Sequence, residues 1–492
     1  MSRLIIFALA LLLTIALPLC AAAQEQEQQQ QPSRQKPQEQ RASSSAATEP
    51  GAAPTAAALY EEASNYSTKK FQEFAQSKVQ FNPKLLEQTL KEQRALAARN
   101  AALLAARSEH TGDDLFYLGM LYNLAENGAS SIDALKRYLA ATPANERRAQ
   151  GARYVITQLA AKLASFDEAE RSLSDYIKGG PQNPGERFRM EDALARAYLK
   201  SKQLERALAH ADEAFKAAKT VKPTTSNATN LDYALYTSST TLVDVLLEAK
   251  KTERAASVLE EMRRLAIAIP STRLYLDVTE RLATVLIDTG RKADGIRMLE
   301  ESIKYVTDNV KDQKAQSSLL SALTNKLRQS AIRGEIAPEI TVANWIDQKP
   351  VKLSELRGQV VLLDFWATWC GPCLAAFPHL KAWHEKYKER GLVIIGLTRY
   401  YGSGEGRDML PPEELAFLGR FKKEHALPYG FAVADGAENH SNYAITGIPT
   451  AVLIDRQGKV RLVTTGTGAG NEAQITVTIE KLLQEAVTAY EP

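Results

Sequence analysis

The chain has 492 residues, of which 45% are hydrophobic and 24% are charged. These values are typical of soluble globular proteins, and the length is enough for two or three domains with sizeable cores. Lys and Arg number 61 against 58 Asp and Glu, which gives a formal net charge of +3, and the basic residues form no long cluster. The sequence therefore argues against a nucleic acid partner. It also predicts only weak attraction to anionic membranes.

Residues 1–23 are predicted to be a secretory signal peptide. An almost purely apolar stretch, Leu4 to Leu19, follows a short basic start, and small residues precede a cut after Ala23. One alternative is an uncleaved membrane anchor, although the apolar run is slightly short for a span. Another is lipidation of Cys20, which the bulky Leu19 disfavours. Each outcome predicts an exported protein of the bacterial periplasm or cell envelope.

Residues 24–58 are predicted to be a disordered tether. The segment is rich first in Gln and Glu and then in Ser, Ala and Pro. It has almost no large apolar residue whose burial would offset the entropy lost on ordering. The alternative is that this segment binds a partner.

Residues 59–334 are predicted to form an all-helical region. Apolar residues recur at intervals of three and four, Ala, Leu, Glu, Lys and Arg dominate, and most prolines stand at breaks between periodic segments. Most of the recurring Leu, Ala and Tyr positions are expected to be helix–helix core.

One unit in this region has Ala195 and Tyr198 on a first helix and Ala207, Ala211 and Ala214 on a second. These spacings resemble the tetratricopeptide repeat, in which small side chains let two antiparallel helices meet closely. Five successive units each have a small residue at the position that Ala207 occupies in this one. These residues lie 38, 38, 48 and 40 residues apart, so the units are longer than the usual repeat of about 34 residues. The resemblance implies stacked helical hairpins that bind a peptide or protein. The equivalent small positions are Ser131, Ala169, Ala207, Ala255 and Gly295.

Residues 335–492 are predicted to form an α/β domain, because the apolar period changes from helical to strand-like after Gly334. The sequence predicts a buried strand, a helix, a second buried strand, a late strand pair and a closing helix. In the same order, the expected ranges are 360–366, 377–390, 392–397, 450–455 with 459–463, and 471–489.

Cys370 and Cys373 stand one helical turn apart directly after the first of these strands. The only other cysteine is Cys20, so a cleaved protein would hold a single pair of thiols. The first thiol is expected at the N-terminus of a helix, where unpaired N–H groups and the helix dipole stabilise a thiolate. Cys373 is expected to be the resolving thiol, and the redox-active pair takes the place of a cofactor.

The run Asp364 to Cys373, together with Gly447 to Thr450, resembles the thioredoxin superfamily. Ala337 to Ile340 and Val351 to Gly358 narrow the resemblance to the TlpA-like extracytoplasmic thiol-disulfide oxidoreductases, relatives of the redoxin branch. The expected architecture is therefore multidomain, with an all-α helical-hairpin array followed by an α/β thioredoxin-like domain. The resemblance covers about the last third of the chain and says nothing about the helices.

Asp364 lies within an apolar strand, a costly place for a carboxylate without a role. It matches the buried acid of thioredoxin, and the resemblance implies that it moves the proton of the resolving thiol Cys373. The alternative is a hydrogen-bonded acid of the core. The lysine that usually accompanies this acid on the neighbouring strand is replaced by Gly396.

Pro449 matches the proline that follows a cis peptide bond and lies against the active-site disulfide in the superfamily, which implies that the Ile448 backbone pairs with an extended substrate. Trp369 is a plausible exposed contact, and Trp366 is expected to pack in the core. Many TlpA-like relatives have a glutamate where this chain has Ala376. The expected substrate groove is bordered by Trp369, Gly371, Pro372, Ile448 and Pro449.

Two other chemistries are disfavoured. A zinc site normally needs four ligands, and the chain has no second cysteine pair and no histidines at metal-ligand spacing. A peroxidase is a minor alternative, because Ala367 stands three residues before Cys370 where the hydroxyl residue of a peroxidatic site is expected. No metal is therefore expected.

Tyr400 to Pro412 contains three glycines and is expected to be a flexible insertion. Glycines without a strand–turn–helix phosphate motif are weak evidence for nucleotide binding. The segment is also a candidate border of the substrate groove.

The sequence favours an exported thiol-disulfide oxidoreductase, and the Gly-Pro dipeptide between the cysteines favours a protein-disulfide reductase. Its expected partners are disulfide-bearing or reduced extracytoplasmic proteins, a membrane thiol carrier as electron donor, and a peptide or protein ligand of the helical array. The alternative is a helical interaction scaffold in which the thioredoxin-like domain is structural or redox-sensing.

Overall fold

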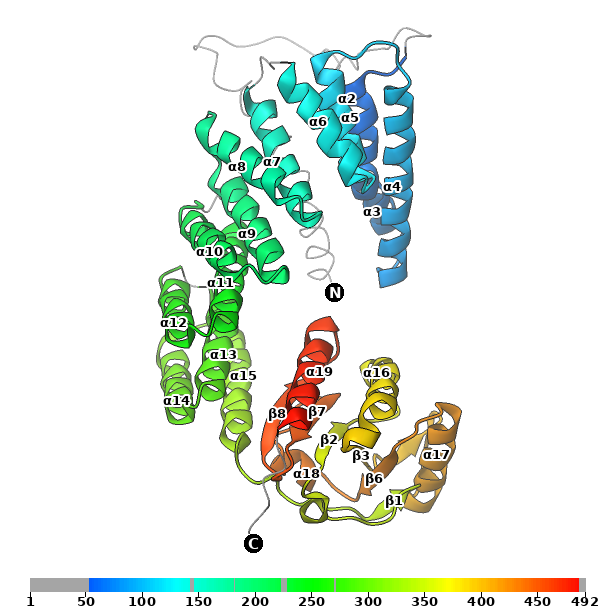
Figure 1. The fold of residues 1–492 in the computed structure, drawn as a ribbon. Helices are drawn as coiled ribbons and strands as arrows, with labels where there is room; N and C mark the ends of the chain where they lie inside the picture. The colour runs from blue at the N-terminus through cyan, green and yellow to red at the C-terminus, as the bar shows by residue number, and fades with distance from the viewer. Residues whose placement is uncertain (1–52, 142–145, 181, 223–227, 270, 486–492) are drawn as a thin grey trace, which may run out of the picture. The chain divides into compact units, whose positions relative to one another are not determined.

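The computed structural model describes residues 53–141, 146–180, 182–222, 228–269 and 271–485 (Figure 1). The predicted signal peptide and the predicted tether up to residue 52 lie outside these residues. Contacts divide the chain into two compact units, Met1–Lys251 and Thr252–Pro492. The second unit contains four long helices and the sheet that carries the cysteine pair.

The described part of the first unit consists of helices joined by short loops. Helices pack in consecutive pairs, α5 with α6, α7 with α8, and α9 with α10. The helices are α2 (Ala56–Ser64), α3 (Tyr66–Gln76), α4 (Pro83–Ala105), α5 (Gly112–Leu124), α6 (Gly128–Ala140), α7 (Glu146–Lys162), α8 (Phe166–Lys178), α9 (Pro184–Lys200), α10 (Leu204–Lys219) and α11 (Ala228–Glu248).

The pair α5 and α6 explains why small residues recur in the sequence. A Cβ atom added to Gly119 of α5 would stand 2.5 Å from Cγ of Leu135 on α6. Ser131 of α6 is fully buried and donates its hydroxyl hydrogen to the Gly119 carbonyl over 2.8 Å. Small residues at these positions therefore let the two helices approach closely.

The turn that precedes the second helix of each unit contains one residue in the left-handed conformation. These residues have φ values between 57° and 84°, and each stands five residues before the small residue of its unit. The five turns therefore share this backbone conformation at the same position. The residues are Glu126, Ala164, Lys202, Lys250 and Gly290, so only the last turn uses glycine.

Replacing Gly290 by alanine is expected to lower the free energy of unfolding by about 1 kcal/mol, because an L residue disfavours a positive φ. No neighbouring atom lies within 4 Å of the added Cβ, so the backbone conformation alone accounts for the loss. Thermal unfolding followed by circular dichroism measures the change. The control is Gly419→Ala, where the Cβ also meets open space but φ is not positive. An equal loss in the control would contradict this explanation.

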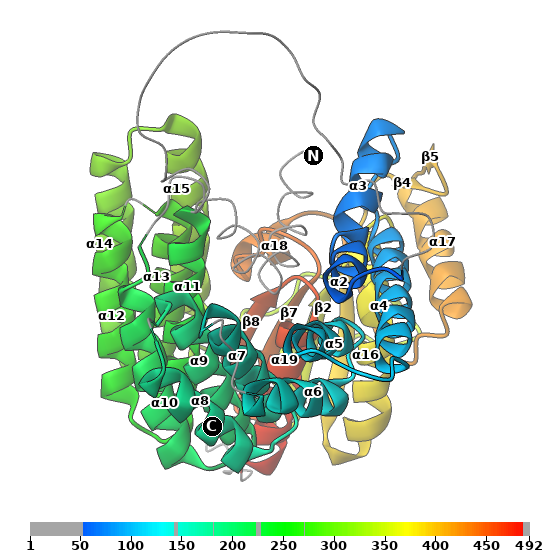
Figure 2. The same cartoon turned by 90° about the horizontal axis from the view of Figure 1, so that it is seen from above.

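The four helices of the second unit lie in two rows, with α12 and α14 in one and α13 and α15 in the other (Figure 2). Within this group α13 packs against α12, α14 and α15. The helices are α12 (Thr252–Ala268), α13 (Thr272–Asp288), α14 (Lys292–Asn309) and α15 (Gln313–Ile332).

The segment after α15 pairs directly with a strand of the sheet, β8 (Val460–Thr465). The N–H of Gly334 donates to the carbonyl of Val460 over 2.7 Å, and the N–H of Val460 donates to the carbonyl of Glu335 over 3.0 Å. Nε of Arg333 donates to the carbonyl of Arg461 over 3.2 Å. The segment that connects α15 to the sheet domain is therefore hydrogen-bonded to the sheet.

A six-stranded sheet forms the centre of this domain, in the order β1-β6-β3-β2-β7-β8. Strands β2, β3 and β6 are parallel, and β1, β7 and β8 pair antiparallel with their neighbours. The parallel pair β2 and β3 needs a crossover, which α16 supplies. The remaining strands are β1 (Asn344–Ile346), β2 (Val360–Phe365), β3 (Leu392–Arg399), β6 (Gly430–Ala434) and β7 (Thr450–Ile454).

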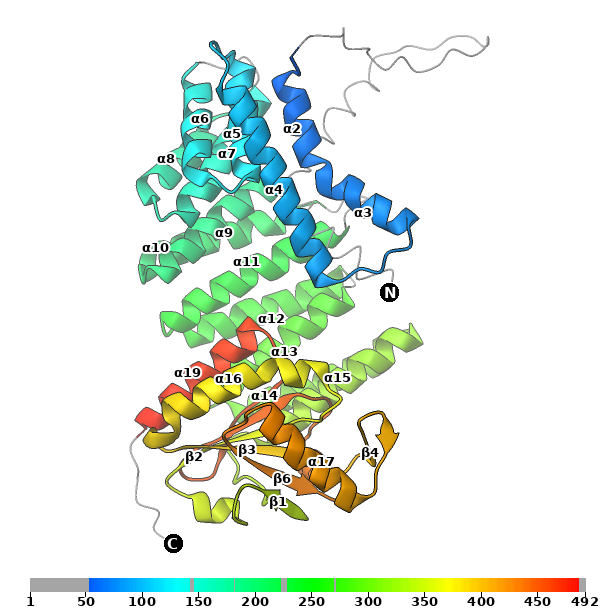
Figure 3. The ribbon, with the colours of Figure 1, turned by 90° about the vertical axis from the view of Figure 1, so that its right-hand side faces the viewer.

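Alternate residues of β2 enter two different cores. Val360 and Leu362 pack with α16 (Gly371–Tyr387), α17 (Pro411–Glu424) and α19 (Ala469–Gln484), which cover one face of the sheet (Figure 3). Val361, Leu363 and Phe365 pack on the other face, with Ala337, Leu353 and the segment after α18 (Glu438–Asn442). The predicted fold class, an all-α array followed by an α/β thioredoxin-like domain, is confirmed.

Candidate active site

The two cysteines lie at the start of α16 and form a disulfide, with their Cα atoms 5.2 Å apart. Cys370 is the N-cap residue, with extended φ and ψ of −87° and 95°. Gly371 and Pro372 occupy the first two helical positions, where the missing N–H of proline leaves no helical hydrogen bond unmade. Cys370 therefore lies at the N-terminus of the helix, and Cys373 lies in its first turn.

Helix geometry favours negative charge on the first sulfur. The N–H of Cys373 donates to Sγ of Cys370 over 3.2 Å. After reduction, the same N–H and the positive end of the helix dipole stabilise a thiolate there. Cys370 is 5% exposed and Cys373 is 1% exposed, so the first sulfur is the more accessible to a substrate.

Asp364 is buried in β2, 4% exposed, on the face of the sheet that α16 covers. In the described part of the chain its carboxylate has no hydrogen-bond partner. This differs from the alternative expectation of a hydrogen-bonded acid in the core. Burial raises the pKa of Asp364 to about 7. A carboxyl group with such a pKa exchanges a proton readily at neutral pH.

The neighbourhood of Asp364 explains the missing lysine. Asp364 pairs in register with Gly396 of β3, and Gly396 pairs with Phe431 of β6. A Cβ atom on Gly396 would stand 2.8 Å from the Phe431 ring and 3.1 Å from Nε1 of Trp366. The buried Trp366 also packs against Phe377 and Phe421 and is a core residue, as expected. Aromatic rings therefore occupy the space of the absent side chain.

The peptide bond between Ile448 and Pro449 is cis, as the resemblance implies. It directly precedes β7, where Thr450 pairs with Phe365 at the end of β2. Ile448 packs against the core cluster that contains both cysteines. Within the described residues its backbone N–H and carbonyl have no backbone partner.

Trp369 is a large apolar residue of the motif that is exposed, at 62%. Its ring meets the ring of Tyr401 edge-on, with the centroids 5.3 Å apart. The expected flexible insertion therefore reaches the cysteine motif. It contains a short hairpin, β4 (Ser403–Gly404) with β5 (Arg407–Asp408), and the sequence did not single out Tyr401.

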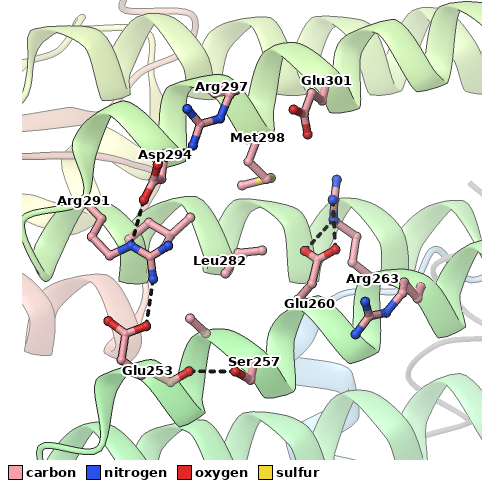
Figure 4. Close-up of a pocket in the computed structure, with 13 residues that line it drawn as sticks. Glu253, Ser257, Glu260, Arg263, Leu282, Arg291, Asp294, Arg297, Met298 and Glu301 are labelled. Atoms are coloured by element: carbon pink, nitrogen blue, oxygen red, sulfur yellow. Dashed lines mark hydrogen bonds and ion pairs between the residues drawn. The ribbon is translucent and has the colours of Figure 1, made fainter.

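A separate pocket of about 410 Å³ lies among α12, α13 and α14 (Figure 4). Arg263 binds both carboxylate oxygens of Glu260 over 3.1 Å. Arg291 bridges Asp294 and Glu253 over 2.8 Å each. The pocket is therefore lined by paired charges of both signs.

No group of three or more His, Cys, Asp or Glu side chains in the described ranges is arranged to hold a metal ion. None of the helices within those ranges combines the length and the apolar character that a membrane span requires.

Residues 333–477 match the Redoxin family. The chain is 33% identical over 127 residues to the thiol-disulfide oxidoreductase ResA of a Bacillus cereus strain, an alignment that covers 26% of this chain and 66% of that protein. It is 32% identical over 176 residues to the protein DipZ of Mycobacterium tuberculosis, covering 35% of this chain and 24% of DipZ. The chain thus spans just under two thirds of the ResA relative and about a quarter of DipZ.

Two solved structures are similar to part of the chain. A putative thiol:disulfide interchange protein DsbE from Chlorobium tepidum is 28% identical, with 31% of this chain and 97% of that chain covered and a TM-score of 0.27. A putative protein disulfide isomerase from Bacteroides thetaiotaomicron is 31% identical, with 31% and 91% covered and a TM-score of 0.26.

Proposed function

Residues 333–477 form a redoxin domain of the thioredoxin superfamily, and from this premise we propose that the protein is a thiol-disulfide oxidoreductase that reduces disulfides in other proteins. The observation that carries the proposal is the disulfide at the start of α16, with the Cys373 N–H donated to Sγ of Cys370. The relatives named as thiol-disulfide oxidoreductases support the same chemistry.

The proposed reaction starts from the reduced pair. The Cys370 thiolate attacks one sulfur of the substrate disulfide, which forms a mixed disulfide and releases the other substrate sulfur as a thiolate that takes up a proton. The deprotonated Cys373 then attacks Sγ of Cys370, which releases the second substrate thiol and re-forms the Cys370–Cys373 disulfide. Two electrons pass from the pair to the substrate.

Asp364 is proposed to accept the proton of Cys373 during the second step. Its raised pKa of about 7 supports this role, because the carboxylate and the acid are then both populated near neutral pH. The released substrate thiolate takes a proton in the same step. Cys373 is buried, so in this proposal an acceptor inside the protein takes the proton that water would take from an exposed thiol.

We propose that the protein works outside the cytoplasm. The predicted signal peptide at residues 1–23 supports export. An exported reductase needs a source of electrons, and a membrane thiol carrier would return two electrons to the Cys370–Cys373 disulfide. The pair itself is the only redox group that this reaction requires.

The helical array is proposed to dock the substrate protein or another protein partner. Stacked helical hairpins expose extended surfaces that suit proteins and peptides. The pocket among α12, α13 and α14 is a candidate contact, because its paired arginines and carboxylates offer both donors and acceptors to a polar segment.

A trapping experiment tests the proposed reaction. In Cys373→Ala the resolving thiol is missing, so mixed disulfides between Cys370 and substrates should accumulate and resist further exchange. Purified full-length protein, reduced with dithiothreitol and freed of it, is mixed with disulfide-bonded insulin and examined on non-reducing gels. A covalent adduct that dithiothreitol releases is the expected result.

The control carries both Cys370→Ser and Cys373→Ala and should form no adduct. If Cys373→Ala also forms none, the thiol exchange proposal is wrong, and the helical scaffold with a structural disulfide becomes the better description.

A further inference from the structure

The insertion between β3 and α17 is an ordered hairpin, β4 with β5, that packs against α17. The N–H of Met409 donates to the carbonyl of Gly402 over 2.9 Å, which closes the hairpin at its base. Gly404 lies so close to Phe417 of α17 that an added Cβ would stand 2.6 Å from its ring. The hairpin therefore has a defined position on the helix.

Glu414 fixes the base of this insertion. It lies in the first turn of α17 and is 3% exposed. Its two carboxylate oxygens accept the N–H groups of Tyr401 and Gly402, each over 2.9 Å. A buried carboxylate is costly unless it is hydrogen-bonded, and here both bonds hold the backbone that carries the Tyr401 ring.

The Tyr401 ring is held from two sides. The Arg399 guanidinium lies 4.7 Å from its centroid, and the Trp369 ring meets it edge-on at 5.3 Å. Trp369 immediately precedes Cys370, so its exposed ring lies beside any peptide that forms a disulfide with that cysteine. We call Trp369 and Tyr401 together the aromatic wall.

We propose that Glu414 and Tyr401 are positioning residues that hold the aromatic wall in place, and that the wall selects polypeptide substrates with an apolar side chain next to the cysteine under attack. The inference rests on the proposed function and adds the substrate class to it. An exposed indole that is already ordered binds an apolar side chain without losing further rotamer freedom. Small disulfides that lack such a side chain gain nothing from the wall.

The experiment compares three substrates of the full-length protein with dithiothreitol as electron donor. Two are disulfide-bonded peptides that differ only in phenylalanine or serine next to the cysteine, and the third is hydroxyethyl disulfide. Wild type should have a KM for the phenylalanine peptide about tenfold below that for the serine peptide, because an aromatic contact of about 1.4 kcal/mol gives a factor of ten.

Tyr401→Ala should remove this preference by raising the KM for the phenylalanine peptide about tenfold. Glu414→Gln should act in the same direction, because one oxygen that accepts an N–H becomes an amide that cannot. Neither change should alter the rate with hydroxyethyl disulfide. Tyr401→Phe keeps the ring and should retain the wild-type preference. Val477→Ala, which removes a 65% exposed side chain from α19, is the matched surface control and should change nothing.

The outcomes separate the two proposals. If wild type reduces none of the three substrates beyond the rate of dithiothreitol alone, the proposed function fails. If wild type reduces hydroxyethyl disulfide but treats both peptides alike, the aromatic wall does not select substrates and this inference alone fails. Loss of hydroxyethyl disulfide reduction in both Tyr401→Ala and Tyr401→Phe would also overturn it, because Tyr401 would then act in the exchange chemistry itself.

Discussion

Cys370→Ser should abolish the reduction of insulin disulfides by the full-length protein, with a loss of at least about 10³-fold in rate. A serine hydroxyl is not ionised at neutral pH, whereas the cysteine sulfur accepts the Cys373 N–H and lies at the positive end of α16, both of which favour a thiolate. The rate of insulin precipitation with dithiothreitol as electron donor measures the loss.

Cys373→Ser is the matched control for this prediction. It keeps the attacking sulfur and should release one substrate thiol per protein in a single turnover, followed by arrest at the mixed disulfide. The attacking and resolving roles assigned to the pair would be wrong if Cys370→Ser showed the burst and Cys373→Ser did not.

Asp364→Asn should remove a pH dependence of stability of up to about 4 kcal/mol between pH 4 and pH 8. The pKa of Asp364 is raised by burial to about 7 in the folded protein, so the folded state binds the proton more tightly than the unfolded chain. The stability that this proton provides is present at low pH and is lost as pH rises towards 7 and above. Asparagine cannot ionise, so the variant lacks this loss.

Urea unfolding at pH 5 and pH 8 tests the sign as well as the size. The fall in the free energy of unfolding from pH 5 to pH 8 should be smaller in Asp364→Asn than in wild type. Asp455→Asn is the control, because Asp455 is also buried but accepts the N–H groups of Gln457 and Lys459 and pairs with Arg461. Its replacement should destabilise the protein without removing that fall. An unchanged fall in Asp364→Asn would show that its carboxyl ionises normally.

Asp364→Asn should also slow catalysis. Without an internal acceptor for the Cys373 proton, the second exchange step should lose about 10²-fold in rate, while the first step at Cys370 continues. Single-turnover release of the first and second substrate thiols separates the two steps.

Local features of the sequence were enough to predict the centre of the site. A helix start after a buried strand defines where Cys370 and Cys373 lie, and an acid inside an apolar strand is unusual enough to single out Asp364. The strands at 360–366 and 392–397 were predicted because they are continuous apolar runs, and they are β2 and β3. These signals need no knowledge of distant contacts.

Features that depend on distant contacts were missed. Strands β1 and β6 were not predicted, because β1 has only three residues, and β6 has only five, of which two are alanine and one is glycine. Glu414 reads in the sequence as an ordinary acid in the first turn of a helix, and only the fold shows that it holds the backbone of Tyr401. The glycines of the insertion suggested flexibility, whereas Gly404 is needed for close packing against Phe417.

The pairing of Gly334 and Glu335 with Val460 has a consequence for aggregation. Strand β8 is at the edge of the sheet, and an open edge offers unpaired N–H and carbonyl groups to strands of other molecules. Here the segment that leaves α15 covers residues 458–461 of that edge. The connection between helices and sheet thus also protects the domain against edge-to-edge association, and a domain cut free at residue 335 would lose part of that protection.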